Sequence, residues 1–213
     1  MKEKETDIFE QTKKFNSGIR LYMFQTGSIK TKLKFIKMNQ SDEPYEIPIP
    51  WFLIKHPEGD VVIDGGMPIE VALDKHKHWG SVVEAYDPVM KASEWCKDVV
   101  KTVNTKPEDV KYVIQTHLHL DHSGAIGHFP NATHITQKLE YDYAFNPDWF
   151  SQPAYIRADF DKPNIRWKFL QGRKTDFYDV YGDGVIKVIF TPGHTPGHQS
   201  VLVNLPKTGH MLF

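Results

Sequence analysis

Four metal-competent side chains lie in one short segment, His117-Leu-His119-Leu-Asp121-His122. His117 and His119 alternate, as residues on one face of an extended segment do, so both imidazoles can point to the same side. Asp121 and His122 follow immediately, where the chain must turn. Neutral imidazoles and carboxylates are the ligands that a zinc-class metal takes in proteins. The crowding therefore predicts metal binding, and it favours two metal sites over one.

A second segment with constrained histidines, Thr191-Pro-Gly-His194-Thr-Pro-Gly-His198, follows the apolar run over residues 185–190. Its two Pro-Gly pairs form stiff turns that would hold His194 in a fixed direction. Another apolar run, Val61-Val-Ile-Asp64, ends in a carboxylate. Buried carboxylates need partners, and metal-bound histidines usually donate their second ring N–H to one. We therefore expect Asp64 to support a metal-binding histidine, with stabilisation of a turn as the alternative.

These segments, together with Val62-Ile-Asp64-Gly-Gly66 and in this order along the chain, resemble the metallo-β-lactamase superfamily. Within it, the sequence is most similar to N-acyl homoserine lactonases, the quorum-quenching enzymes, over residues 47–54, 64–68, 117–124 and 194–200. The resemblance implies an α+β fold, the αβ/βα sandwich, with metals at one edge. It runs from about residue 19 onward, so we expect an N-terminal extension over 1–18 and a hydrolase domain over 19–213.

The resemblance also implies five metal ligands: His117, His119 and His194 for one ion, and Asp121 and His122 for the second. Two divalent ions, expected to be zinc, would lower the pKa of a shared water and supply hydroxide that opens the lactone ring of an N-acyl homoserine lactone. Asp121 is expected both to bind the second ion and to carry a proton to the leaving oxygen. His198 is expected to support the site, because in the family the first histidine of the Pro-Gly-His pair is the ligand.

Three residues of the family pattern are expected beyond Phe213: an aspartate that bridges both metals, a final histidine ligand and a tyrosine that contacts the substrate. We therefore expect a C-terminally incomplete domain. In such a domain the first metal site has all its protein ligands and the second does not.

Composition narrows the possible functions. Lys and Arg total 26 against 27 Asp and Glu, a formal net charge of −1, which argues against a nucleic-acid binder with a broad basic surface. The single cysteine, Cys96, excludes an intrachain disulfide, leaves nitrogen and oxygen as metal ligands, and is expected to be packed inside. The sequence shows neither a signal peptide nor an apolar run of the roughly 20 residues that a membrane helix needs. We expect a cytoplasmic protein whose substrate is a small-molecule lactone. We expect neither nucleic acid nor a membrane as partner, and the sequence leaves open whether the protein forms a homodimer.

Apolar patterning predicts the elements that must position these residues. We expect strands over residues 19–26, 30–37, 50–55, 60–64, 111–115, 133–136, 165–170, 185–190, 199–205 and 210–213. Helices are expected over 7–14, 90–103 and 137–145 and just after 121, and a long loop over 68–88.

Other histidines lack comparable support. His76 and His78 are flanked by lysines and are expected in a solvated loop, and His56 is expected to be exposed in a turn. Apolar loop residues could line a pocket for an acyl chain, with ordinary core packing as the alternative. These residues are Phe35, Ile36, Met38, Leu120, Trp149, Phe150 and Tyr155.

Several other functions are compatible with parts of the pattern. A hydrolase of another lactone, ester or thioester is the nearest alternative, followed by a truncated, non-catalytic product that binds metal. The balanced charge disfavours a nuclease of the same fold. A redox diiron relative typically carries glutamate where His119 stands, so the sequence disfavours that class too.

Overall fold

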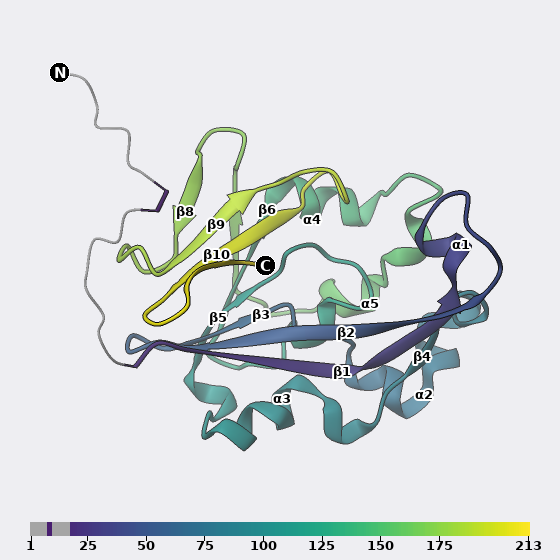
Figure 1. The fold of residues 1–213 in the computed structure, drawn as a ribbon, viewed down its shortest axis with the longest axis horizontal. Helices are drawn as coiled ribbons and strands as arrows, with labels where there is room; N and C mark the ends of the chain where they lie inside the picture. Colours follow the sequence, from purple (N-terminus) through teal and green to yellow (C-terminus); the bar gives the residue numbers. More distant parts are fainter. Residues whose placement is uncertain (1–7, 10–17) are drawn as a thin grey trace.

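Two β-sheets, one of seven strands and one of four, pack against each other through a shared apolar core (Figure 1). The computed structural model describes residues 8–9 and 18–213. Most of the helix predicted over residues 7–14 therefore lies outside the described residues, and residues 8–9 form a turn.

The large sheet has the strand order β4-β1-β2-β3-β5-β6-β7. β1, β2, β3 and β4 pair antiparallel along one half, whereas β3, β5, β6 and β7 run parallel along the other. Its strands are β1 (Arg20–Lys32), β2 (Pro44–Lys55), β3 (Asp60–Ile63), β4 (Asp87–Val89), β5 (Val110–Ile114), β6 (Thr133–Gln137) and β7 (Trp167–Leu170).

The small sheet is antiparallel throughout, in the order β11-β10-β9-β8. Its strands are β8 (Phe177–Asp179), β9 (Ile186–Phe190), β10 (Gln199–Leu205) and β11 (Gly209–Leu212). Its inner face presents Val188 and Val201, which belong to the same buried cluster as Ile54 and Ile114 of the large sheet. Burial of these β-branched side chains is the main force that holds the two sheets together.

The opposite face of the large sheet is covered by helical segments. Trp51 and Leu53 point to this face because side chains alternate along β2, and they pack with Cys96 and Val100. Cys96 is fully buried as predicted, and burial raises the pKa of its thiol to about 12. The helices are α1 (Leu33–Ile36), α2 (Ile69–Trp79), α3 (Cys96–Val99), α4 (Lys138–Phe145) and α5 (Arg157–Phe160). Short 3-10 segments are η1 (Gly80–Glu84), η2 (Ala92–Glu94), η3 (Val100–Val103), η4 (Pro107–Asp109), η5 (Ser123–Ala125) and η6 (Gln152–Ala154).

The predicted α+β sandwich is confirmed, but three element predictions are wrong. Residues 68–88 form α2, η1 and β4 instead of a loop. Apolar residues do not recur there at helical spacing, because α2 is kinked at Asp74 and buries only Val71 and Trp79 among its residues. The helix predicted over 90–103 is interrupted at Trp95, whose backbone is extended.

The third error concerns the first strands. The two strands predicted over 19–26 and 30–37 are one strand, β1, followed by the short helix α1. A bulge between Gln25 and Ser28 lets β1 continue past Gly27, whose φ of 71° suits a residue without a side chain. β8 was not predicted. Among the helices of the described residues, none is long and apolar enough to cross a membrane.

Candidate metal centre

The predicted site residues follow the carboxyl ends of strands that lie side by side. β3 ends just before Asp64, and β5 ends shortly before His117. Because parallel strands all end at the same edge of a sheet, these two residues are brought together there. His194 comes from the loop after β9, in the small sheet. The candidate site therefore lies where loops from the two sheets meet.

The three histidines predicted for the first metal do converge. His117, His119 and His194 each offer a ring nitrogen, and these nitrogens all lie within 4.8 Å of one another. Nδ1 of His119 is 3.1 Å from Nε2 of His194. Nε2 of His117 is buried and has no hydrogen-bond partner among the described residues. A buried nitrogen left without a partner beside two further imidazoles fits a site for a metal ion.

The imidazoles are in the protonation state that metal binding needs. Burial, reinforced by the neighbouring histidines, lowers the pKa of His117 well below its ordinary value. Burial and the nearby His194 lower the pKa of His119 to about 3. The pKa of His194 is lowered by the same causes, loss of hydration first. All three rings are therefore neutral near pH 7, with a lone pair available to a cation.

Asp121 and His122 stand beside this cluster. The rings of His117 and His122 have centroids 4.1 Å apart, and Nε2 of His122 is 3.6 Å from Oδ2 of Asp121. Burial opposes a charge on His122, but the charges of Asp121 and Asp64 and the hydrogen bond to Asp64 outweigh it and raise the pKa of His122 to about 9. His122 is therefore protonated near pH 7 in the metal-free protein. Once it loses that proton, the pair adds one nitrogen and one carboxylate next to the three-histidine cluster, as a second site would require.

Asp64 accepts hydrogen bonds from the histidine loop. Its carboxylate lies 2.8 Å from Nδ1 of His122 and accepts the N–H of Thr116, also at 2.8 Å. The Thr116 hydroxyl is 2.9 Å from Oδ2 of Asp64 and 3.0 Å from Nδ1 of His117. Because an ionised carboxylate can only accept, the hydroxyl proton goes to Asp64, and the hydroxyl oxygen accepts the Nδ1–H of His117. Asp64 thereby leaves Nε2 of both histidines free of a proton in their neutral forms.

His198 lies near the cluster but is tied to its own loop. Its Nδ1 is 3.1 Å from the carbonyl oxygen of Thr191 and 3.0 Å from the Thr191 hydroxyl. Its ring centroid is 5.4 Å from that of His117. A supporting role for His198 stays a prediction.

Three buried glutamines, which the sequence did not single out, connect the two sheets beside the site. Nε2 of Gln199 donates to the carbonyl oxygen of Gln115 at 2.8 Å, and Nε2 of Gln137 donates to Oε1 of Gln199 at 2.8 Å. Nε2 of Gln115 donates to the carbonyl oxygen of Asp64 at 2.8 Å. We call Gln115, Gln137 and Gln199 the glutamine bridge. No local pattern marks these residues, because their partners are distant in sequence.

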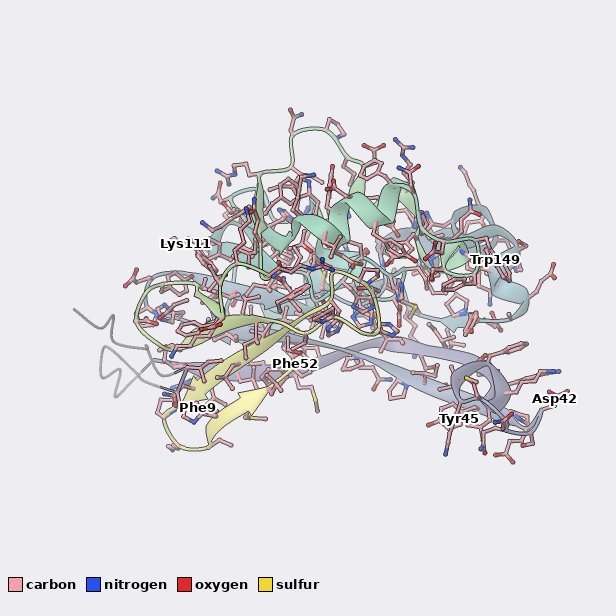
Figure 2. The ribbon with its side chains drawn as sticks, turned by 90° about the horizontal axis from the view of Figure 1, so that it is seen from above. Phe9, Asp42, Tyr45, Phe52, Lys111 and Trp149 are labelled. Atoms are coloured by element: carbon pink, nitrogen blue, oxygen red, sulfur yellow. The ribbon has the colours of Figure 1, made fainter. Side chains whose placement is uncertain are left out.

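A mainly apolar cavity of about 450 Å³ opens beside the cluster. Four of the predicted lining residues form part of its wall: Phe35, Ile36, Leu120 and Phe150. Met38 and Trp149 are exposed and do not line it. Figure 2 shows Trp149 and Tyr45 at the same end of the molecule. Tyr155 is buried and is not one of the lining residues.

Two predictions about other histidines are wrong. His56 is buried instead of exposed: its Nε2 is 2.9 Å from Oδ2 of Asp183, and its ring stacks on Tyr181. His78 is on α2 instead of in a solvated loop, with its Nε2 2.8 Å from Oδ1 of the buried Asp159. Both partners are far away in sequence, so local composition gave no sign of them. His76 is exposed, as predicted, but it too lies on α2 and not in a loop.

The fold and the cluster define a class of metal-dependent hydrolases. Residues 45–212 match the family model of the metallo-beta-lactamase superfamily, and the chain belongs to this superfamily. N-acyl homoserine lactonase AttM of Azorhizobium caulinodans and that of Agrobacterium fabrum are each 58% identical to it over 197 residues, which cover 92% of this chain and 75% of the relative. A solved structure of an N-acyl homoserine lactone hydrolase, with the product N-hexanoyl-L-homoserine at its catalytic metal centre, is 26% identical and has a TM-score of 0.79. That match covers 92% of this chain and 74% of the other. The predicted resemblance is therefore confirmed.

Proposed function

We propose that this protein is a metal-dependent hydrolase that opens the lactone ring of N-acyl homoserine lactones. The observation that carries the proposal is the cluster of neutral imidazoles beside an apolar cavity. Support comes from the 58% identity to proteins named N-acyl homoserine lactonase.

The donor set indicates which metal the site would take. We infer that His117, His119 and His194 hold the first ion, and that Asp121 and His122 contribute to a second. Imidazole and carboxylate donors suit zinc, which we propose as the metal. When bound, such ions supply an activated water and polarise the substrate carbonyl.

Asp121 is the residue we propose for proton transfer. Its side chain is 25% exposed and forms part of the cavity wall. A carboxylate in that position can accept a proton and deliver it to the ring oxygen that leaves the carbonyl carbon. Because the substrate is a ring, the leaving oxygen stays attached to the product.

The cavity wall supports an acyl-chain substrate. Phe35, Ile36 and Phe150 give it an apolar surface next to His119 and Asp121. Each methylene group that leaves water for such a surface contributes about 0.8 kcal/mol. A lactone whose ring reaches the metal centre could therefore place its acyl chain against this wall.

Acid release tests the proposal. Zinc-supplied protein is mixed with a long-chain N-acyl homoserine lactone in weak buffer, and the proton released on ring opening is followed. We expect release by the wild type and by the control His76→Ala, whose side chain is exposed outside the cavity. We expect a loss of more than about 100-fold in His117→Ala, since changing the partners of a ligand alone typically costs 10–100-fold.

A metal-loaded wild type that leaves these lactones closed would contradict the proposal. The substrate would then be sought among other lactones, esters and thioesters, with a substrate panel. Stable metal binding without turnover of any of them would favour a non-catalytic product. A cytoplasmic location and a homodimer stay predictions from the sequence, and light scattering of the purified protein would test the second.

A further inference from the structure

Glu140 is a fully buried carboxylate that contacts both loops of the candidate metal centre. It lies in the first turn of α4, directly after β6, and has no exposed surface. Oε1 of Glu140 accepts the backbone N–H of Leu118 at 3.0 Å, and Leu118 separates the two histidines of the H-x-H pair. Oε2 accepts the hydroxyl of Thr195 at 2.5 Å, and Thr195 directly follows His194. One carboxylate is thus bonded to the chain neighbour of a proposed ligand on each side.

A third hydrogen bond reaches Glu140 from Tyr155. The phenol hydroxyl of Tyr155 donates to Oε1 of Glu140 at 3.1 Å. The Tyr155 ring packs edge-on against the ring of His119, with centroids 4.7 Å apart. Burial first, and then the charge of Glu140, raise the pKa of Tyr155, so its hydroxyl stays protonated and remains a donor. Glu140 therefore also holds the aromatic ring that packs against His119.

The second loop lies directly on the backbone of Glu140. A Cβ atom at Gly197 would be 2.1 Å from the backbone nitrogen of Glu140 and 2.4 Å from its Cα. Only glycine fits at that distance, so the loop that carries His194 is pressed against the start of α4. The side-chain bonds of Glu140 and this backbone contact act on the same loop.

We propose that Glu140 is a positioning residue: it holds the two histidine-bearing loops at the separation and orientation at which their imidazoles converge on one metal ion. The inference rests on the proposed function, because it takes His117, His119 and His194 as ligands. The loops follow strands of different sheets, β5 and β9, so the geometry of neither sheet alone sets the distance between them. Hydrogen bonds that end on a charged carboxylate are about twice as strong as neutral ones.

Zinc affinity tests this role without reliance on activity. The affinity of the first site is measured by competition with a chromophoric chelator, and thermal unfolding of the metal-free protein is recorded in parallel. Glu140→Gln keeps the shape of the side chain but loses its charge, and it should bind zinc about 10–100-fold more weakly. The cobalt-substituted variant should also show a changed visible absorption, because the three ligands no longer meet at the same geometry.

Thr195 provides a second way to break the same contact. Thr195→Val removes the hydroxyl bonded to Glu140 and should weaken zinc binding in the same direction, whereas Thr195→Ser keeps the hydroxyl and should restore it. The double variant Glu140→Gln with Thr195→Val should lose less than the sum of the two single losses in free energy, because the residues act through one bond. Asp142→Asn is the matched control, since Asp142 is an exposed carboxylate on the same helix.

The outcomes separate the two proposals. Wild-type zinc affinity in Glu140→Gln would overturn the positioning role. Glu140→Gln could also unfold at a lower temperature than the wild type and yet bind zinc normally below that temperature. That result would overturn the positioning role too, because Glu140 would then contribute to stability alone. If Glu140→Gln does not fold, Thr195→Val against Thr195→Ser decides the question. A wild-type protein without zinc affinity would overturn the metal site itself, and the positioning role with it.

Discussion

At the scale of single residues, the carboxylate of Asp64 determines which ring nitrogen carries the proton in two neutral histidines, His117 and His122. Asp64 bonds Nδ1 of His122 directly and reaches Nδ1 of His117 through the Thr116 hydroxyl. In their neutral forms, both rings therefore keep Nε2 free of a proton for a metal ion. Asp64 has a φ of 65°, a left-handed conformation that asparagine also tolerates, so the carboxylate can be changed without changing the backbone.

Asp64→Asn should weaken metal binding while the protein stays folded. The amide can turn its NH2 group toward Nδ1 of His122, and the proton of that ring then moves to Nε2 and blocks it. We expect zinc affinity to fall about 10–100-fold, first at the site that His122 serves. Elemental analysis after dialysis against a weak chelator measures the metal that remains. Asp74→Asn, at an exposed aspartate, is the control, and a wild-type metal content in Asp64→Asn would contradict the tautomer argument.

At the scale of elements, the site depends on how closely the loop between β9 and β10 approaches α4. The Cβ that Gly197→Ala adds would meet the backbone of Glu140, which cannot move aside as a flexible side chain could. Overpacking of this kind costs about 1–3 kcal/mol. We expect the free energy of unfolding to fall by that amount and zinc affinity to fall with it.

Chemical denaturation with and without zinc checks the Gly197→Ala prediction. Thr208→Ala, at an exposed residue in the turn between β10 and β11, serves as the control. If Gly197→Ala unfolds with the free energy of the wild type, the loop can shift away from α4, and the close approach is not a constraint on the site.

The elements that could be predicted were those whose signals are local. The hairpin of β2 and β3 was predictable because apolar β-branched runs flank a turn at His56-Pro-Glu-Gly59. The histidine motifs were predictable because their metal-competent side chains lie close together in the sequence. Glu140 was not, because an acidic residue in the first turn of a helix is common for electrostatic reasons alone. Its proposed role comes from two loops that the fold brings to it from different sheets.

At the scale of the whole molecule, neutral histidines that are buried or partly buried make stability depend on pH. Burial lowers the pKa of both His128 and His134 to about 4. In the unfolded chain the histidine pKa is about 6.5, so between pH 6.5 and 4 the unfolded state binds more protons. Stability contributed by these groups is fully present above pH 6.5 and is lost as pH falls toward 4.

His134→Gln should reduce this acid sensitivity. His134 is buried, and its Nε2 accepts the N–H of Gly127 at 3.1 Å, which a glutamine oxygen can also do. Each such histidine contributes a slope of about 1.4 kcal/mol per pH unit inside the window. Denaturant unfolding of the metal-free protein at pH 7 and pH 5 measures the slope, with His76→Gln as an exposed control. Equal slopes in wild type and His134→Gln would show that His134 is protonated as readily in the folded state as in the unfolded one.

The glutamine bridge joins two sheets that each supply part of the candidate metal centre. The proposed ligands of the first ion come from both sheets, so they meet only after the sheets have docked. An ion bound there recognises the assembled molecule and not its separated halves. At a free concentration 100 times its dissociation constant, such an ion adds about 2.7 kcal/mol to the stability of the docked form. The supply of zinc in the cell would then help to set how long each copy of the protein survives proteolysis, apart from how fast it turns over substrate.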